Sequence, residues 1–391
     1  MLNTPFSPWP SFTQEEADTV QRVLLSNKVN YWTGQEGREF EKEFAAFSDS
    51  EYAIAVSNGT TALDLALNAL VIGQGDEVIV TSRTFIASIS SIVNAGATPV
   101  FADLDRDTQN ISPETIRSVI NDKTKAIICV HLAGWPCEMD GVLALAKEHN
   151  LKVIEDCAQA HGARYKGKSV GSFGDISAWS FCQDKIMTTG GEGGMVTTND
   201  KELWSKMWSF KDHGKSYDAI YNREHPPGFR WVHESFGTNW RLTEMQSAIG
   251  RIQLKRMPEW TRIRGEHAAK LVHVCREFDC IRIPKIPDYI QHANYKFYVF
   301  VVPDKLKDGW SRDKILQELN ILGVPAMQGS CSEVYLEKAF EGKPYKPKKS
   351  LPVAKELGET SLMLQVHPSL TAEQIDWVSQ QLKQVLFQAS L

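Results

Sequence analysis

The sequence has little cysteine for its length and no paired cysteine motif. Seven of the 391 residues are cysteine, and no two of them stand in a CxxC spacing. Structural zinc sites need such close ligand pairs, so we predict no metal site. Most of the cysteines lie in apolar runs, and their number is odd. These features are typical of reduced, buried thiols, and we therefore expect a cytoplasmic protein.

Long apolar runs and an excess of positive charge are also missing. No run approaches the roughly 18 apolar residues of a membrane-spanning helix, and the N-terminus does not resemble a signal peptide. The formal net charge is -5, so no positive field would attract nucleic acid. Internal repeats and low-complexity tracts are absent as well. The sequence therefore predicts neither a membrane nor a nucleic-acid partner.

The glycine motif of dinucleotide-binding folds does not occur. No GxGxxG sequence follows the first predicted strand, and VIGQG at residues 71–75 only joins a helix to a strand. This argues against a plain Rossmann dehydrogenase. What the chain does have is an ordinary globular composition, with 42% hydrophobic and 23% charged residues. Its 391 residues are enough for two domains.

Short apolar runs alternate with helical patterns through the first half of the chain. Strands are predicted at the start of 76–96 and at 97–103, 126–130, 176–181 and 195–198. This alternation predicts an α/β fold whose mainly parallel central sheet has helices on both faces. We predict a large domain over residues 1–250 and a smaller C-terminal α+β domain over 251–391. Pro258 is expected to divide the helical stretch that joins them.

Two of the predicted strands end in residues that carry chemistry. The run at 153–154 leads to Asp156, and the run at 176–181 ends just before Lys185. In a parallel sheet both residues would lie beyond the carboxyl ends of strands, where open α/β sheets bind ligands. Pyridoxal phosphate needs a lysine for a Schiff base and an acid opposite its pyridine nitrogen. The pair suits pyridoxal 5'-phosphate as cofactor with Lys185 as the catalytic residue; an Asp and a Lys 29 residues apart are by themselves an ordinary pair, and the surrounding segments give the prediction its weight.

Other cofactor contacts are indicated upstream. At residues 57–70 a polar loop opens directly into a helix, and helix N-termini bind phosphate. Gly59 permits close approach of the backbone, and Thr60 offers a hydroxyl; the alternative is an ordinary helix capped by Asn58 or Thr60. Phe85 stands at a strand-to-helix junction, where it would stack on a flat ring or pack in the core.

These segments together resemble the DegT/DnrJ/EryC1/StrS sugar aminotransferases, which are fold type I, aspartate aminotransferase-like, pyridoxal-phosphate enzymes. The resemblance runs nearly end to end, and the series EDCAQAHGA, GDISAWSFCQDK and GGEGG carries it most specifically. It implies that Lys185 forms the Schiff base and shuttles the proton, and that Asp156 pairs with the pyridine nitrogen. It also implies cofactor contacts from Gln159 to the phenolic oxygen, from Gly59, Thr60 and Ser180 to the phosphate, and from Phe85 to the ring.

The same resemblance carries implications for assembly and reaction. Asn239 matches the family residue that reaches the phosphate of the neighbouring subunit's cofactor, which implies a homodimer with shared active sites. A dehydrating branch of the family has His where this chain has Lys185, so transamination is favoured. The family's usual reaction takes the amino group of L-glutamate, leaves 2-oxoglutarate and aminates a ketosugar.

The acceptor sugar is the open part of this prediction. The runs CQDKIMTTGGEGGM and PPGFRWVHESFGTNWR resemble the branch that makes 8-amino-3,8-dideoxy-manno-octulosonate, an acidic sugar of bacterial lipopolysaccharide. Arg83, Arg230 and His233 are candidate substrate residues, because an acid needs a cation; surface or interface salt bridges would also explain them. Two alternatives stay open. They are a nucleotide-linked 3-keto or 4-keto hexose as acceptor, and a non-catalytic regulator that binds pyridoxal phosphate.

Overall fold

A seven-stranded sheet forms the centre of the structure, a computed structural model that describes residues 6–391. Its strands lie in the order β1-β9-β8-β5-β4-β2-β3. They are Tyr52–Val56 (β1), Glu77–Thr81 (β2), Thr98–Ala102 (β3), Thr124–Val130 (β4), Lys152–Asp156 (β5), Ile176–Ser180 (β8) and Gly194–Thr198 (β9). Only β9 pairs antiparallel with its neighbours, and the other pairs are parallel. The predicted α/β fold is therefore confirmed.

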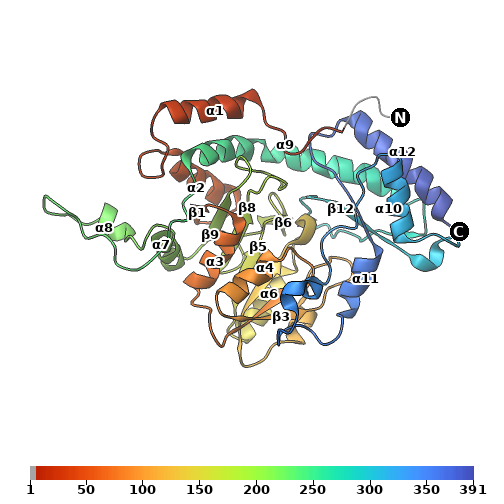
Figure 1. The fold of residues 1–391 in the computed structure, drawn as a ribbon, viewed down its shortest axis with the longest axis horizontal. Coiled ribbons are helices and arrows are strands. Elements are labelled where there is room, and N and C mark those ends of the chain that lie inside the picture. The colour runs from red at the N-terminus through yellow and green to blue at the C-terminus, as the bar shows by residue number, and fades with distance from the viewer. Residues whose placement is uncertain (1–5) are drawn as a thin grey trace.

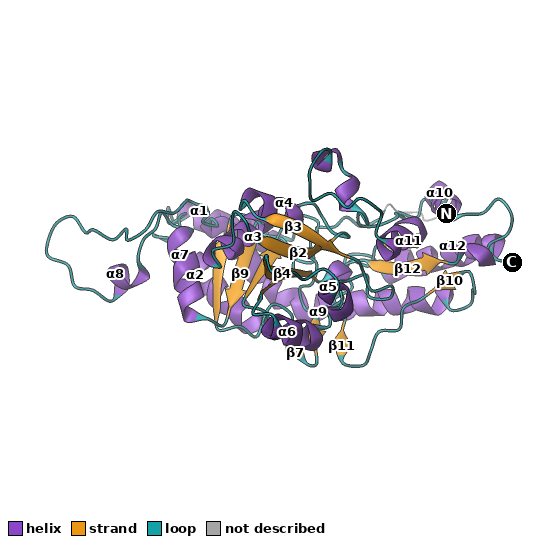
Figure 2. Ribbon diagram, turned by 90° about the horizontal axis from the view of Figure 1, so that it is seen from below, coloured by secondary structure: helices purple, strands orange, loops and turns teal. Residues whose placement is uncertain are grey.

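Helices cover both faces of this sheet (Figure 2). One face packs on α3 (Gly59–Ala69), α4 (Ala87–Asn94) and α7 (Lys201–Phe210). The other packs on α2 (Glu36–Phe47), α5 (Pro113–Arg117), α6 (Met139–Glu148) and the long helix α9 (Glu244–Cys275). Strand β8 is buried along its whole length for this reason. Strands buried on both faces read as continuous apolar runs, which is why the sequence pattern predicts them well.

A second, smaller core lies at the C-terminal end of the chain. Strands β10 (Ile281–Arg282), β12 (Phe297–Val301) and β13 (Ser361–Leu364) form an antiparallel sheet, over which α10 (Arg312–Ile321) and α12 (Ala372–Ala389) pack. A third sheet contains β11 (Ile290–Gln291), β6 (Arg164–Tyr165) and β7 (Lys168–Ser169). The helices α1 (Gln14–Leu25) and α11 (Pro352–Thr360) complete the body. Figure 1 shows α9 running from the large core to the small one.

The prediction that Pro258 divides the joining helix is wrong. Residues Glu244–Cys275 form one helix of 32 residues with Pro258 inside it. Proline removes one backbone hydrogen bond, and packing on both sides of it offsets that loss. Met257 is buried in the large core, and Leu271 is buried in the small one. The domain boundary at residue 250 falls inside this shared helix and stays a prediction.

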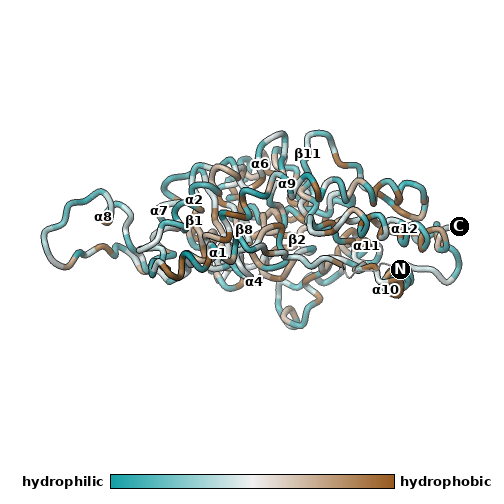
Figure 3. Tube along the Cα trace, turned by 90° about the horizontal axis from the view of Figure 1, so that it is seen from above, coloured by the Kyte–Doolittle hydropathy of each residue, from teal (hydrophilic) through white to brown (hydrophobic). Residues whose placement is uncertain are grey.

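Residues 215–238 form a projecting arm with little regular structure. The arm contains the short helix α8 (Tyr217–Tyr221), and an isolated bridge pairs Lys215 with His233 at its base. Figures 1 and 3 show the arm reaching away from the body, with mostly hydrophilic residues along it. Three aromatic side chains are nevertheless exposed there: Phe229, Trp231 and Phe236 are 78%, 84% and 99% exposed. Exposed aromatics on a projecting segment mark a contact surface.

Within the part of the chain that the structure describes, no helix is long and apolar enough to cross a membrane. The cytoplasmic location stays a prediction. The seven cysteines are all free thiols, and five of them are buried.

His161 is buried without any hydrogen bond, in the core between α2 and the sheet. Neither ring nitrogen has a partner among residues 6–391. Its ring instead lies against Trp179 and Phe181, with centroids 5.2 and 5.6 Å away. Burial, together with the nearby charges of Lys185 and Arg264, lowers the pKa of His161 to about 3 from an ordinary value of 6.5. The imidazole is therefore neutral in the folded protein.

We expect this histidine to make the protein acid-sensitive. The unfolded chain protonates His161 below pH 6.5 and the folded chain only near pH 3, so the free energy of unfolding falls as pH falls through this window. From pH 7 to pH 5 this group should remove about 2 kcal/mol. Urea unfolding of His161→Leu should show a smaller difference between those two pH values. The exposed His273→Leu should keep the wild-type difference, and an unchanged difference in His161→Leu would contradict the assignment.

Candidate active site

A cavity of about 1030 Å³ opens between the central sheet and the small C-terminal sheet. Strands β5 and β8 are parallel neighbours, so Asp156 and Ser180 at their carboxyl ends meet at one edge. Lys185 follows in the turn after β8. The lining contains seven residues singled out in the sequence, namely Gly59, Thr60, Phe85, Asp156, Gln159, Ser180 and Lys185. The structure brings these residues together, and their individual roles stay predictions.

The carboxylate of Asp156 is buried at the end of β5. Ser88 Oγ donates a hydrogen bond to Oδ2 at 2.8 Å, and the Ala158 N–H donates to Oδ1 at 3.1 Å. Burial raises the pKa of Asp156, while the Ser88 bond and the positive charge of Lys185 counteract it. A buried carboxylate on a cavity wall is stabilised by a cation, and the protonated nitrogen of a pyridine ring meets that need.

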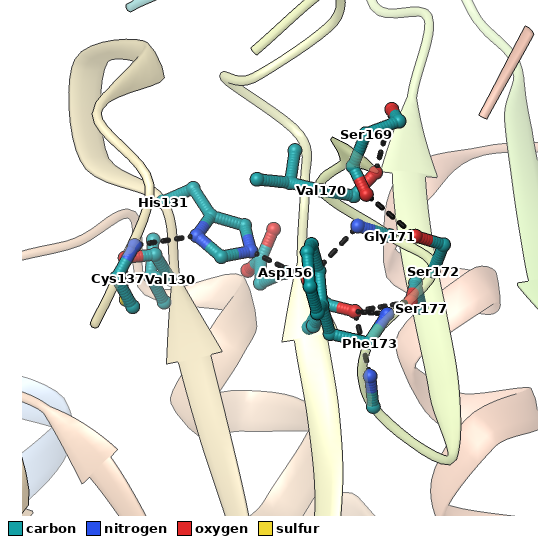
Figure 4. A network of polar contacts seen from close by, with 12 residues as sticks. Val130, His131, Cys137, Asp156, Ser169, Val170, Gly171, Ser172, Phe173 and Ser177 are labelled. Carbon is teal, nitrogen blue, oxygen red and sulfur yellow. Dashed lines mark hydrogen bonds and ion pairs between the residues drawn. The ribbon is translucent and has the colours of Figure 1, made fainter. Parts of the chain in front are cut away.

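The preceding residue, Glu155, anchors β5 from its other face, because side chains alternate along a strand. Both of its carboxylate oxygens accept bonds, from the N–H groups of Gly171, Phe173 and Gly174 at 2.8 Å and from His131 Nε2 at 3.0 Å. His131 Nδ1 accepts the Cys137 N–H, which places the ring proton on Nε2 (Figure 4).

Glu155 and Asp156 are equally buried, and their pKa values shift in opposite directions. Burial would raise the pKa of Glu155, but the His131 bond and the backbone amides lower it overall. Asp156 has fewer donors, so burial prevails there. His131, Glu155 and Cys157 have ligand atoms within 4.8 Å of one another, which is close enough for a metal. Since the Glu155 oxygens already accept hydrogen bonds, we assign this group to holding the strand.

The N-terminus of α3 forms an anion-binding corner of the cavity. Asn58 is the N-cap, and its Oδ1 accepts the Thr61 N–H at 2.9 Å. The first amides of a helix have no partner inside it, and they carry the positive end of the helix dipole. A Cβ at Gly59 would lie 2.6 Å from Ser180 Cβ, so only glycine lets α3 pack this closely on β8. Free amides beside the hydroxyls of Thr60 and Ser180 suit a phosphate.

Two further side chains suit a flat aromatic cofactor. Gln159 Oε1 accepts the Ala133 N–H at 2.8 Å, so the amide NH₂ of Gln159 keeps its hydrogens for another acceptor. Phe85 lies on the cavity wall, and 69% of its surface is exposed, whereas large apolar rings are usually buried. A donor for a phenolic oxygen and a face for stacking are thus both present.

The backbone of Lys185 is held by two hydrogen bonds, and its amine lies on the cavity wall. Its N–H donates to the Cys182 carbonyl at 3.0 Å, and Trp9 Nε1 donates to the Lys185 carbonyl at 2.8 Å. The side chain is 16% exposed, and Nζ lies 3.7 Å from Asp184 Oδ1. The centroid of the Tyr295 ring is 5.4 Å from the same nitrogen. An amine held at the cavity wall in this way can react with a bound aldehyde.

Four residues singled out in the sequence lie outside the cavity of their own chain. Arg230 and His233 are exposed on the arm, and Asn239 is exposed at its base. Arg83 is fully buried behind Tyr298, 5.6 Å from that ring, and does not line the cavity. The substrate roles of Arg83, Arg230 and His233 and the phosphate role of Asn239 stay predictions.

The buried Arg83 is held by neutral partners. Its Nε donates to Gln109 Oε1 at 3.1 Å and its Nη2 to Ser361 Oγ at 3.0 Å. Its Nη1 has no partner among residues 6–391, and burial lowers the pKa of its guanidinium. It therefore links the large core to β13 rather than opening onto the cavity.

Sequence reasoning missed several residues at the site. Ser88 and His131 support the β5 carboxylates from separate elements, and no local pattern marks them. Tyr295, Lys296 and Tyr298 reach the cavity from the small domain. The alternation in YKFYVFVV could have indicated that Lys296 and Tyr298 share one face of a strand.

Comparison with known proteins decides the family. The sequence profile of the DegT/DnrJ/EryC1/StrS aminotransferase family matches residues 10–383. The chain belongs to this family. It is 36% identical to the GDP-perosamine synthase of Escherichia coli O157:H7 over 382 residues, 96% of each chain. It is 40% identical to the GDP-perosamine synthase of Caulobacter vibrioides, over 91% of this chain and 92% of the relative.

Solved structures agree with this assignment. An aminotransferase from Psychrobacter cryohalolentis superposes with a TM-score of 0.97 at 64% identity, covering 98% of this chain and 99% of the other. DesV from S. venezuelae gives a TM-score of 0.86 at 32% identity, with the same coverage. Spr1654 from Streptococcus pneumoniae, described as a putative sugar aminotransferase, has been solved in its PLP form. It superposes with a TM-score of 0.85 at 26% identity, covering 98% of this chain and 99% of the other. The family member described here is a sugar aminotransferase that depends on pyridoxal phosphate.

Gly59 offers a direct test of the phosphate corner. In Gly59→Ala the new methyl group would press on Ser180, so α3 must shift away from β8. We expect the dissociation constant of pyridoxal phosphate to rise about tenfold or more, measured by absorbance during dialysis. Gly265→Ala is a matched control in open space and should bind like the wild type. Equal retention of cofactor by both variants would rule out this corner as the phosphate site.

Proposed function

We propose that the protein transfers the amino group of L-glutamate to the carbonyl carbon of a nucleotide-linked keto hexose, leaving 2-oxoglutarate. The cavity volume of about 1030 Å³ carries this proposal. The cofactor residues line its large-domain side, and the space continues to the small sheet. Such a volume is at the upper end of small-molecule sites, and it leaves room for an acceptor much larger than an amino acid.

The relatives support the same class of acceptor. Besides the two GDP-perosamine synthases, a dTDP-3-amino-3,6-dideoxy-alpha-D-galactopyranose transaminase of Aneurinibacillus thermoaerophilus is 35% identical over 370 residues, 94% of each chain. These names place a nucleotide-linked sugar in each reaction. We infer a similar product here, an amino sugar for a bacterial surface glycan.

In this proposal the chain's own residues do three things. Bound pyridoxal phosphate supplies an aldehyde that takes up the amino group and a ring that withdraws electrons from the reacting carbon. Asp156 keeps the ring nitrogen protonated, and Ser88 fixes the orientation of that carboxylate. The α3 N-terminus holds the phosphate. Lys185 would hold the aldehyde covalently until the donor amine displaces it, and its freed amine would then act as general base and general acid at the substrate carbon that carries the nitrogen.

An acidic octulosonic acid is the second candidate acceptor, giving 8-amino-3,8-dideoxy-manno-octulosonate. One observation favours it. Lys296 lies on the cavity wall, and no carboxylate among residues 6–391 forms an ion pair with it. A cation without a partner is suited to an acid sugar. The predicted contacts from Arg83, Arg230 or His233 to such a sugar belong to this candidate.

A panel of acceptors would decide between these candidates. The enzyme would be given glutamate with a nucleotide-linked 4-keto hexose, a nucleotide-linked 3-keto hexose or the 8-oxo octulosonic acid, and release of 2-oxoglutarate would be followed. We expect turnover with a nucleotide-linked sugar. Turnover with the octulosonic acid alone would select the second candidate, and none with any acceptor would favour a regulator that only binds the cofactor.

Lys185→Ala should lose about a thousandfold or more of this rate, because the variant lacks the side chain that bonds to the cofactor and carries the proton. Lys305 is exposed and does not line the cavity, so Lys305→Ala is the control and should keep the wild-type rate. Continued cycling by Lys185→Ala would show that the reaction uses another residue.

We also propose that the working unit is a homodimer in which each arm serves the other subunit. Asn239 is exposed and lies outside the cavity of its own chain, although the family resemblance assigns it to the cofactor phosphate. The arm that precedes Asn239 in the same chain exposes Phe229, Trp231 and Phe236. A second copy would cover these rings and receive Asn239 at its own phosphate corner, which explains both observations with one contact.

Two inactive variants should restore each other if Asn239 acts across the interface. Lys185→Ala and Asn239→Asp would be co-expressed with different tags, and the mixed dimer isolated. In the mixed dimer, one site would contain both changes and the other neither. Random pairing makes only some of the dimers mixed, so the co-expressed protein should have about a quarter of the wild-type rate before the mixed dimer is isolated. Each variant alone is the control. If Asn239 acts within its own chain, every site keeps one defect and the rate stays at background.

A further inference from the structure

Lys296, the residue directly before strand β12, lies on the cavity wall that faces the large domain. Side chains alternate along a strand, so neighbours point to opposite sides. Phe297 and Val299 are buried in the small core, whereas Lys296 and Tyr298 both line the cavity. The small domain therefore presents an ammonium and a phenol, two residues apart, to the space where substrate must lie.

The ammonium of Lys296 is close to the amine that does the chemistry. The Tyr295 ring centroid is 4.8 Å from Lys296 Nζ and 5.4 Å from Lys185 Nζ, so both amines lie against one ring. Asp184 lies beside them, but its carboxylate is already engaged by Lys185 Nζ and by the Tyr295 hydroxyl. Asp184 therefore forms an ion pair with Lys185, whereas Lys296 is influenced by its charge without forming one.

A third cation lies behind this wall. Arg264 on α9 is fully buried, and its Nη1 is 3.3 Å from the Tyr295 carbonyl. Its Nε and Nη2 have no partner among residues 6–391, and burial lowers the pKa of its guanidinium to about 9. Burial and the charge of Arg264 lower the pKa of Lys296 to about 8. The wall therefore carries positive charge that the protein leaves uncompensated, and a bound anion would stabilise it.

We propose that Lys296 and the hydroxyl of Tyr298 bind a carboxylate of the substrate, one that lies next to the carbon on which Lys185 acts. The Tyr298 oxygen accepts the Ser330 N–H at 2.9 Å, and its hydroxyl donates to Ser330 Oγ over 3.4 Å, a long bond that a closer anion would replace. The carboxylate belongs either to the amino donor, where it is attached to the reacting carbon, or to an acidic sugar acceptor. This assignment rests on the proposed aminotransferase function.

Binding of unreactive acids tests the site without turnover. Glutarate stands in for the donor and 3-deoxy-manno-octulosonate for an acidic sugar, each titrated by calorimetry into enzyme loaded with pyridoxal phosphate. Lys296→Met should raise the dissociation constant of one of them about 10- to 100-fold, the effect of losing a charge-assisted hydrogen bond. Lys296→Arg should recover part of the loss, and Tyr298→Phe should give a smaller one. Lys305→Met is the matched control and should bind both acids like the wild type.

The outcomes separate the two sources and the two proposals. A loss confined to glutarate assigns the carboxylate to the amino donor, and a loss confined to the octulosonic acid assigns it to the acceptor. Unchanged dissociation constants for both acids in Lys296→Met would overturn the site, as would a wild type that binds neither. These binding measurements need no turnover. If every ketosugar failed as an acceptor, the proposed function would be rejected, and the test of the carboxylate site would still be valid.

Discussion

The active site depends on a carboxylate buried at the end of a central strand. Burying a charge is costly unless hydrogen bonds or an opposite charge accompany it. Asp156 receives one hydroxyl and one amide, which is less than a carboxylate can accept, and its pKa is raised by burial as a result. The position is therefore stabilised by a cation from the cavity. In the proposed site the protonated ring nitrogen of the cofactor would supply this cation, so that cofactor binding would compensate the buried charge of Asp156.

The neighbouring carboxylate shows the contrast. Glu155 is also buried, but hydrogen bonds from His131 and from backbone amides keep its pKa below the ordinary value without any ligand. It holds the carboxyl end of β5 in place through His131 and the loop around Gly171. Two consecutive acids on one strand thus divide the work: one fixes the strand, and the other faces the cavity. The alternation of side chains in a strand makes this division possible.

The other parts of the site reach the same edge from distant segments. Strand β8 leads Lys185 to the cavity, and α3 packs on β8 because Gly59 has no side chain. The small domain closes the opposite side with Tyr295, Lys296 and Tyr298. Helix α9 connects both cores without a break at Pro258, so the two walls share one rigid element. The arm projects from the body (Figure 1), and none of its residues lines the cavity of its own chain, which is consistent with the proposal that a second copy completes the site.

The sequence by itself determined the mainly parallel sheet, most of its strands and helices along the chain, and the residues at the strand ends, but not strand β1 at Tyr52–Val56. Strands buried on both faces are continuous apolar runs; Asp156 and Ser180 end two such strands, and Lys185 lies in the turn after the second. The N-terminus of α3 was equally visible, because helix starts have local signals. Pro258 shows where local reasoning failed, since packing along both flanks outweighs one lost hydrogen bond.

Only the tertiary structure decided which distant groups meet those strand ends. Ser88, His131 and the Lys296–Tyr298 face come from separate elements, and nothing local to them shows their proximity to Asp156 or Lys185. It also showed Arg83 behind the cavity wall rather than on it. Chain connectivity sets the order of elements, whereas burial and charge compensation in three dimensions set their neighbours. For this reason the cofactor chemistry could be predicted from motifs, and the cationic wall could not.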